Sequence, residues 1–196
     1  HAIGDGAVRI VLDGYEAARR ANGTRDSRHR IEHIEVIHPD DIPRFAELGF
    51  GASMQPIHAP GTGFPMEPTA SIIGRDKAPY AYAWQTLREA GAPMIFATDW
   101  PVSPIDPMPN LKAAVARKKW ADSDPDQRQS LGAAIASYTR DGAWIEFMES
   151  RKGSLKPGML ADVVVLSADI ETRDPETLHD VRPAVTIADG RIVHEA

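Results

Sequence analysis

The apolar positions of this chain follow a helical period in some stretches and form short unbroken runs in others. From residue 5 to residue 22 they recur at three- and four-residue spacing, the pattern of one helical face, and Asn22-Gly23 ends it. Short runs bounded by loop-forming residues predict strands over 28–36, 49–56 and 92–99. Helical spacing predicts further helices over 38–50, 80–91, 110–121 and 130–150, the last interrupted near Asp141-Gly142.

Strands and helices alternate over residues 1–121, which indicates right-handed βα units around a parallel sheet. A strand stub at residue 1 adds at most one strand to the three runs. This number is too small for a closed eight-stranded barrel. The pattern alone leaves two interpretations: half of a barrel is missing from this sequence, or the fold is not a barrel.

The pattern changes near residue 153. The stretches 158–170 and 181–196 are rich in β-branched residues, and Asp189-Gly190 between two short runs is a strong hairpin signal. We therefore divide the chain into an α/β domain, 1–152, and a small β appendage, 153–196. Within the first domain, residues 56–78 are rich in Gly and Pro without a period, as in functional or mobile loops.

The composition mainly excludes functions. The 196 residues carry a net charge of −6 with a pI near 5.6, which gives no support for binding nucleic acid or an anionic membrane. The absence of cysteine excludes disulfides, thiol catalysis and cysteine-ligated zinc. No apolar run reaches the roughly 18 residues of a membrane span, and no signal peptide is evident, so we expect a cytoplasmic protein. The chain has no initiator Met, and we expect it to be part of a longer polypeptide.

Three polar residues stand where reactive groups gather in a parallel βα fold, at the carboxyl ends of strands. They are His1, His33 and Asp99. Two imidazoles and a carboxylate suit a divalent ion such as zinc. Each also has an ordinary structural interpretation, because a histidine in a strand is often a hydrogen-bonded core residue and an aspartate at a strand end often forms a turn. Spacing alone leaves both interpretations open.

Other chemistry-bearing residues give weaker signals. His58 lies in the long loop, where it could reach a substrate or simply be solvated. Glu32 should face away from His33 and pair with an arginine nearby. Tyr82 and Trp84 are most simply buried residues of a helix. The segment "RKKW", 117–120, is most simply the solvated end of a helix.

Four motifs occur in order along the chain: "HAIGDGA", "RHRIEHIEVIHPDDIPRFAELGFGASMQP", "FATDWPVSPIDP" and "GSLKPGMLADVVVLS…TIADGRIV". Together they resemble the carboxyl-terminal portion of the amidohydrolase superfamily, specifically amidohydrolase family 3, the group similar to N-substituted formamide deformylase. The resemblance covers essentially the whole chain. The last motif marks the superfamily broadly, whereas the first three together are more specific.

The resemblance implies a fold and a chemistry. It implies the carboxyl-terminal half of a metal-dependent (β/α)8 TIM barrel, with 153–196 as part of a small β-sandwich. It also implies hydrolysis of small-molecule amide or other C–N bonds by metal-activated water. Under this resemblance His1, His33 and Asp99 bind the metal, most simply zinc, and Asp99 also shuttles the proton. His58 would contact the substrate.

The sequence departs from the family pattern in one large respect. The His-x-His pair of the first strand and the bridging ligand of a middle strand have no counterpart here. We therefore expect this chain alone to be inactive unless it pairs with the missing amino-terminal half of the barrel or self-associates. Two alternatives stay open: a non-catalytic fragment or assembly module, and a copper site built on the α-amine and imidazole of His1.

Overall fold

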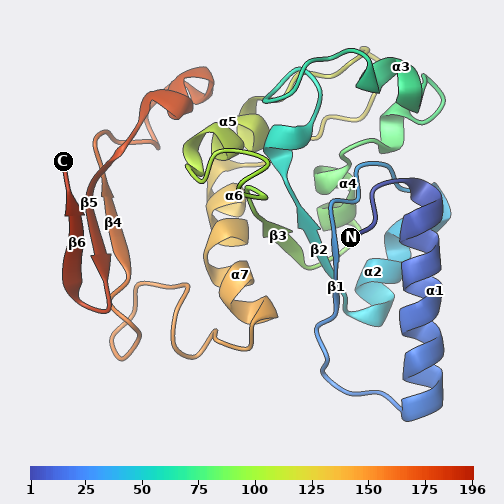
Figure 1. The fold of residues 1–196 in the computed structure, drawn as a ribbon, viewed down its shortest axis with the longest axis horizontal. Helices are drawn as coiled ribbons and strands as arrows, with labels where there is room; N and C mark the ends of the chain where they lie inside the picture. The colour runs from blue at the N-terminus through green and yellow to red at the C-terminus, as the bar shows by residue number, and fades with distance from the viewer.

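The computed structural model describes residues 1–196 and contains two separate three-stranded sheets (Figure 1). The first sheet is parallel, with order β1-β2-β3, and consists of β1 (Arg30–Glu32), β2 (Gly51–Met54) and β3 (Met94–Phe96). Its strands pair in register, with Ile31 opposite Ala52 and Ser53 opposite Ile95. All three predicted strands are thus present and parallel, although each is shorter than its apolar run.

The strand stub expected at residue 1 is also present. Ala2 forms a parallel bridge with His33, and its amide donates to the carbonyl of Glu32 at 3.1 Å. The amino terminus therefore adds a single-residue parallel bridge beside β1, in the position of a fourth strand. The sheet is open: its strands do not close into a barrel within this chain.

Helices connect the parallel strands and cover their apolar sides. The helix α1 (Asp5–Asn22) buries Val8 and Leu12 and ends before Gly23, as its apolar spacing predicts. The next helix, α2 (Ile42–Leu48), stops at Gly49, whose left-handed φ of 69° is favourable for glycine. Figure 1 shows both helices on the β1 side of the parallel sheet.

The remaining helices are short. They are α3 (Thr69–Ile73), α4 (Trp84–Glu89), α5 (Met108–Ala116), α6 (Leu131–Tyr138) and α7 (Arg140–Ile145). Short 3-10 helices lie at η1 (Pro39–Asp41), η2 (Pro56–His58), η3 (Ala78–Tyr80) and η4 (Pro175–Asp180). The interruption predicted in 130–150 falls at Thr139, between α6 and α7, two residues before the expected Asp141-Gly142.

The second sheet is antiparallel and lies at the far end of the molecule (Figure 1). It consists of β4 (Val163–Leu166), β5 (Pro183–Ala188) and β6 (Arg191–Glu195), and the predicted Asp189-Gly190 turn joins the last two. Buried Leu178, in the η4 turn that contacts α5, links this sheet to the α/β part. Much of the sheet surface remains open, with exposed Val164 and Ile192.

Two predictions about the aromatic-rich segments are wrong in an informative way. Tyr82 is buried but precedes α4 and has a left-handed φ of 50°, so it is not a helix residue. The helix α5 ends at Ala116 instead of continuing to residue 121. Arg117 then turns inward and is only 8% exposed, whereas Lys118 and Lys119 are exposed, so "RKKW" lies beyond the helix and is solvated only in part.

The structure is mixed α/β, as predicted. None of its helices combines the length and the apolar character that crossing a membrane requires. The boundary near residue 153 separates the two sheets in sequence, and the division into two domains stays a prediction.

Candidate metal centre

The parallel sheet brings three polar side chains together at the carboxyl ends of its strands. His33 follows β1 directly, His58 ends the turn η2 after β2, and Asp99 lies three residues beyond β3. One potential ligand atom from each of these residues lies within 4.8 Å of the others. Because parallel strands end at the same edge of a sheet, residues that are far apart in sequence meet there.

His1 joins this group through His33. The Nδ1 atom of His1 lies 2.7 Å from Nε2 of His33, and the two ring centroids are 4.9 Å apart. The bridge between Ala2 and His33 fixes this approach, since it places the first two residues alongside the end of β1. The structure thus gathers all four residues that the sequence nominated: His1, His33, His58 and Asp99.

Gln55 determines which nitrogen of His33 faces the site. The Oε1 atom of Gln55 lies 3.0 Å from Nδ1 of His33, and both side chains are buried. An amide oxygen can only accept a hydrogen bond, so Nδ1 of His33 carries the proton. Nε2 of His33 is therefore unprotonated, and its lone pair is directed toward His1. A metal-ligating histidine needs such an unprotonated nitrogen.

His58 is held in a polar environment although it is only 6% exposed. Its Nδ1 lies 3.7 Å from Oε1 of Glu35, and its Nε2 lies 3.9 Å from Oδ2 of Asp99. Phe64 packs edge-on against the ring at 5.1 Å between centroids. The alternative of a solvated loop histidine is therefore wrong. Nε2 is buried without any hydrogen-bond partner.

Unusual backbone conformations concentrate around these side chains. His33, Ile34, Tyr82 and Asp99 have positive φ angles of 81°, 52°, 50° and 59°. Such angles cost conformational energy in residues other than glycine and often occur at functional sites. The packing of the surrounding residues therefore holds these strand-end residues in unfavourable backbone conformations.

Asn110 on α5 connects two of the loops that carry the site. Its Oδ1 accepts from the amide of Ile57 at 2.6 Å, and its Nδ2 donates to the carbonyl of Ala97 at 2.6 Å. Asn110 is completely buried. One side chain thus fixes the segment before His58 relative to the segment before Asp99.

The charge of the site comes from Asp99 and the neighbouring Glu35. Burial raises the pKa of Glu35, but the interactions with His58 and Tyr82 outweigh it and leave the pKa below its usual value. The hydroxyl of Tyr82 donates to Oε2 of Glu35 at 2.9 Å. Burial and the charge of Glu35 raise the pKa of Tyr82, so the hydroxyl keeps its proton.

These residues fit a divalent ion. The buried Nε2 of His58 has no partner, Nε2 of His33 is unprotonated and contacts only Nδ1 of His1, and a carboxylate lies beside the two histidines. Imidazole nitrogens with one carboxylate form a donor set suited to zinc and similar ions. The sequence did not identify Gln55, Glu35, Tyr82 or Asn110, because their importance arises from contacts between different strands and loops.

The other histidines lie outside the centre. His38 caps the turn η1, accepting from the amide of Asp40. His29 stacks on Tyr15, and His179 and His194 belong to the carboxyl-terminal part. Glu32 pairs with Arg30, as predicted.

Comparison with known proteins decides the family. A model described as "Amidohydrolase family" matches residues 1–194. The chain belongs to this family. The prediction of family membership from the four motifs is confirmed.

Several proteins are similar to this amidohydrolase-family chain. It is 38% identical over 173 residues to "Protein LONG AFTER FAR-RED 3" of Arabidopsis thaliana, which covers 86% of this chain and 29% of the relative. It is 33% identical over 200 residues to the putative amidohydrolase YtcJ of Bacillus subtilis (strain 168), a match that covers 100% of this chain and 37% of the relative. It is 27% identical over 199 residues to N-substituted formamide deformylase of Arthrobacter pascens, a match that covers 100% of this chain and 36% of the relative.

A solved structure gives the same indication. An uncharacterized metal-dependent hydrolase from Pyrococcus furiosus matches with a TM-score of 0.65 at 31% identity, covering 90% of this amidohydrolase-family chain and 33% of the other. The chain therefore spans about a third of the length of the relatives that it matches.

Proposed function

We propose that the protein containing this chain is a metal-dependent hydrolase that cleaves amide or other C–N bonds of small molecules. The observation that carries the proposal is the convergence of His33, His58 and Asp99, with His1 against His33, at one edge of the parallel sheet. Membership of the amidohydrolase family supports the reaction class. Zinc is the metal that this donor set suits best.

The architecture that we propose extends beyond this chain. The parallel sheet would form the carboxyl-terminal half of a (β/α)8 barrel, and residues 153–196 would contribute to a β-sandwich. Support comes from the open edges of both sheets and from the share of the relatives that the chain covers. The ligands that this chain lacks would come from the remaining part of the barrel.

In this proposal His1, His33 and Asp99 hold the ion, and Asp99 also transfers the proton. A divalent ion held by these residues would supply a Lewis acid for the scissile carbonyl and a bound water whose pKa is lowered to about 7. The carboxylate of Asp99 accepts a proton from the attacking water and delivers it to the departing nitrogen. The water oxygen joins the carbonyl carbon while the C–N bond breaks, so that the products are a carboxylic acid and an amine.

The test is hydrolysis by the full-length protein. We expect stoichiometric zinc by elemental analysis and zinc-dependent release of amine from an N-substituted formamide or another small amide. Asp99→Asn should lower kcat by about 100-fold or more, because it removes the group that accepts the proton. Asp122→Asn, which changes an exposed carboxylate outside the site, is the matched control.

Three results would contradict the proposal. An Asp99→Asn variant with unchanged kcat would remove the assigned role of Asp99. Stoichiometric copper in place of zinc would favour a redox site at His1. A full-length protein that binds no metal and hydrolyses none of these bonds would favour an assembly module.

A further inference from the structure

Glu35 is the one acidic side chain next to the centre that the proposed reaction does not use. It lies two residues beyond His33, and two groups of Tyr82 hold it. The hydroxyl of Tyr82 donates to Oε2 at 2.9 Å, and the amide of Tyr82 donates to the carbonyl of Glu35 at 2.7 Å. The other carboxylate oxygen, Oε1, faces Nδ1 of His58 at 3.7 Å, slightly beyond hydrogen-bond length.

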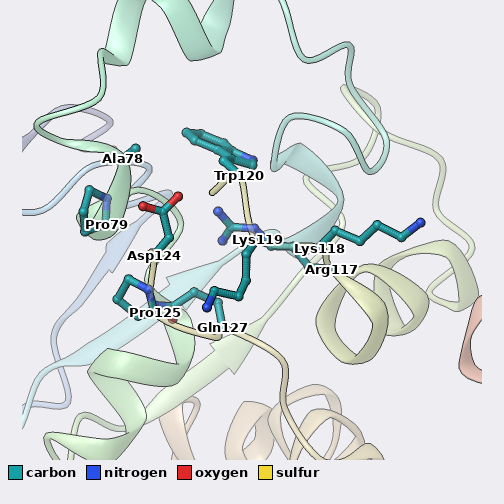
Figure 2. A pocket seen from close by; sticks show the side chains of 9 residues that line it. All are labelled: Ala78, Pro79, Arg117, Lys118, Lys119, Trp120, Asp124, Pro125 and Gln127. Atoms are coloured by element: carbon teal, nitrogen blue, oxygen red, sulfur yellow. The ribbon is translucent and has the colours of Figure 1, made fainter. Parts of the chain in front are cut away.

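Tyr82 is itself fixed from behind. Arg117 donates to its carbonyl at 2.7 Å and to the carbonyl of Ala81 at 3.3 Å. The guanidinium also lies over the rings of Tyr82, Trp84 and Trp120, at 5.8, 4.9 and 5.3 Å from their centroids. Figure 2 shows Arg117 and Trp120 together among the residues that line one small pocket.

His58 therefore lies between two carboxylates, with one ring nitrogen facing each. A neutral imidazole carries a single proton, so only one of its nitrogens can donate. Nε2 faces Oδ2 of Asp99 across 3.9 Å and has no hydrogen-bond partner, although it is buried. If Nδ1 bears the proton, two acceptors face each other across that gap, and an ion between them would satisfy both.

We propose that Glu35, held by Tyr82, is a positioning residue that keeps the proton of His58 on Nδ1 and the lone pair of Nε2 directed at the ion beside Asp99. The inference rests on the proposed metal-dependent function. It assigns His58 to the metal, whereas the family resemblance suggested a contact with substrate. Carboxylates that orient metal-bound histidines in this way recur in metalloproteins.

The test is a double-mutant cycle on zinc affinity. It uses the full-length protein, stripped of metal and titrated against a chromophoric zinc chelator, so no turnover is needed. Glu35→Ala should weaken zinc binding by about 10- to 100-fold, the usual effect of losing an orienting partner. His58→Ala removes the ligand itself and should weaken zinc binding at least as much. The double variant should bind zinc no more weakly than His58→Ala alone, because Glu35 acts only through His58. Glu47→Ala, on an exposed face of α2, is the control.

A second pair of variants changes fewer atoms, so that a loss of zinc affinity cannot be attributed to misfolding. Tyr82→Phe keeps the buried ring and removes only the hydroxyl, so it should weaken zinc binding by about three- to tenfold. Glu35→Gln keeps an acceptor oxygen and should retain more affinity than Glu35→Ala. In the zinc-loaded protein, ¹⁵N spectra should show the proton of His58 on Nδ1.

Several outcomes would overturn the inference: additive losses in the cycle, full zinc affinity in His58→Ala, or a proton on Nε2 of His58 in the zinc-loaded protein. Failure of the proposed hydrolase function has a different signature. In that case amide turnover is absent while the zinc-affinity cycle still shows the coupling between Glu35 and His58.

Discussion

At the scale of single residues, the centre depends on partners that fix how each ligand is presented. His33 lies at a strand end because β1 carries it there, yet Gln55 selects the nitrogen that it offers. Asp99 adopts a left-handed backbone that turns its carboxylate toward His58. The ligands and their partners lie on different strands, so parallel pairing determines the geometry of the centre.

The clearest residue-scale prediction concerns Gln55. Replacing it by Met keeps the volume of the side chain but removes the acceptor for Nδ1 of His33. Zinc affinity should fall by about 10- to 100-fold, because His33 loses the bond that fixes its tautomer and ring orientation. Chelator competition measures the loss.

The matched control is Gln85→Met on α4, where the side-chain amide of Gln85 donates to Glu89 on the surface. Equal zinc affinity in Gln55→Met and the unmodified protein would show that His33 does not need this partner.

The sequence identified His1, His33 and Asp99 because a polar residue after an apolar strand is conspicuous. It could not identify Gln55 or Glu35 by the same rule. Both lie close to strand ends, but each matters only through a side chain that another segment supplies. Such pairs depend on register and on loop path, which apolar periodicity does not specify.

At the scale of elements, the segment between α5 and α6 is not helical, and hydrogen bonds to the polar side chains Asp124 and Gln127 anchor it. Asp124 is 6% exposed and accepts from Arg75 at 2.6 and 3.1 Å and from the amide of Ala121 at 2.9 Å. Gln127 accepts from the amides of Gln85 and Thr86 at the start of α4. These anchors keep Arg117 against Tyr82 although helix α5 ends at Ala116.

Asp124→Asn should destabilise the fold in a pH-dependent manner. The hydrogen bonds from Arg75 lower the pKa of Asp124 below its unfolded value of about 3.9. Its contribution to stability is therefore complete above about pH 4 and is lost as the pH falls through the folded-state pKa. We expect a loss of about 1–2 kcal/mol at pH 7, reduced because Arg75 is largely exposed. This difference should shrink below pH 4.

Urea unfolding of both proteins between pH 2.5 and 7 provides the measurement. Asp126→Asn is the control, because Asp126 pairs with Arg128 on the surface and should contribute little. A constant difference between Asp124→Asn and the unmodified protein across this range would contradict the assignment.

Element ends were the least predictable feature. "RKKW" has the spacing of a helix end, but buried aromatic rings and two free carbonyls offer Arg117 a better environment than solvent does. Burial lowers the pKa of Arg117 to about 10, which leaves it charged at neutral pH. No local signal in the sequence indicates that this arginine turns inward.

At the scale of the whole molecule, both sheets have open sides. The antiparallel sheet exposes Val164, Val165, Ile192 and Val193, and the parallel sheet is not closed. Unpaired strand edges and exposed apolar side chains promote association with other chains. These surfaces agree with the proposal that further polypeptide covers them in the full-length protein.

The 196-residue chain on its own should therefore self-associate and should not hydrolyse amides. Size-exclusion chromatography with light scattering should show mass increasing with concentration. Replacing Val164 and Ile192 by Thr should reduce the association, whereas the same replacement at Val8, which is buried, should instead destabilise the fold. Metal-dependent turnover by the monomeric chain would contradict this prediction.

The overall class was predictable from the sequence, because strand–helix alternation gives parallel pairing and the Asp189-Gly190 turn gives the hairpin. Closure of a barrel was not, since it depends on strand number and on pairing between the first and last strands. The three parallel strands of this chain pair with one another and leave the outer edge of β3 without a strand partner, so they are compatible with more than one larger architecture.

Asn110 ties together the segments that carry His58 and Asp99 and leaves the outer part of the loop between them outside this connection. It fastens Ile57 and Ala97 to α5 from beneath, while residues 59–77 extend outward from that fastening without carrying a candidate ligand. The spacing of His58 and Asp99 should therefore tolerate insertions in this outer loop, provided that Phe64 keeps its contact with the ring of His58.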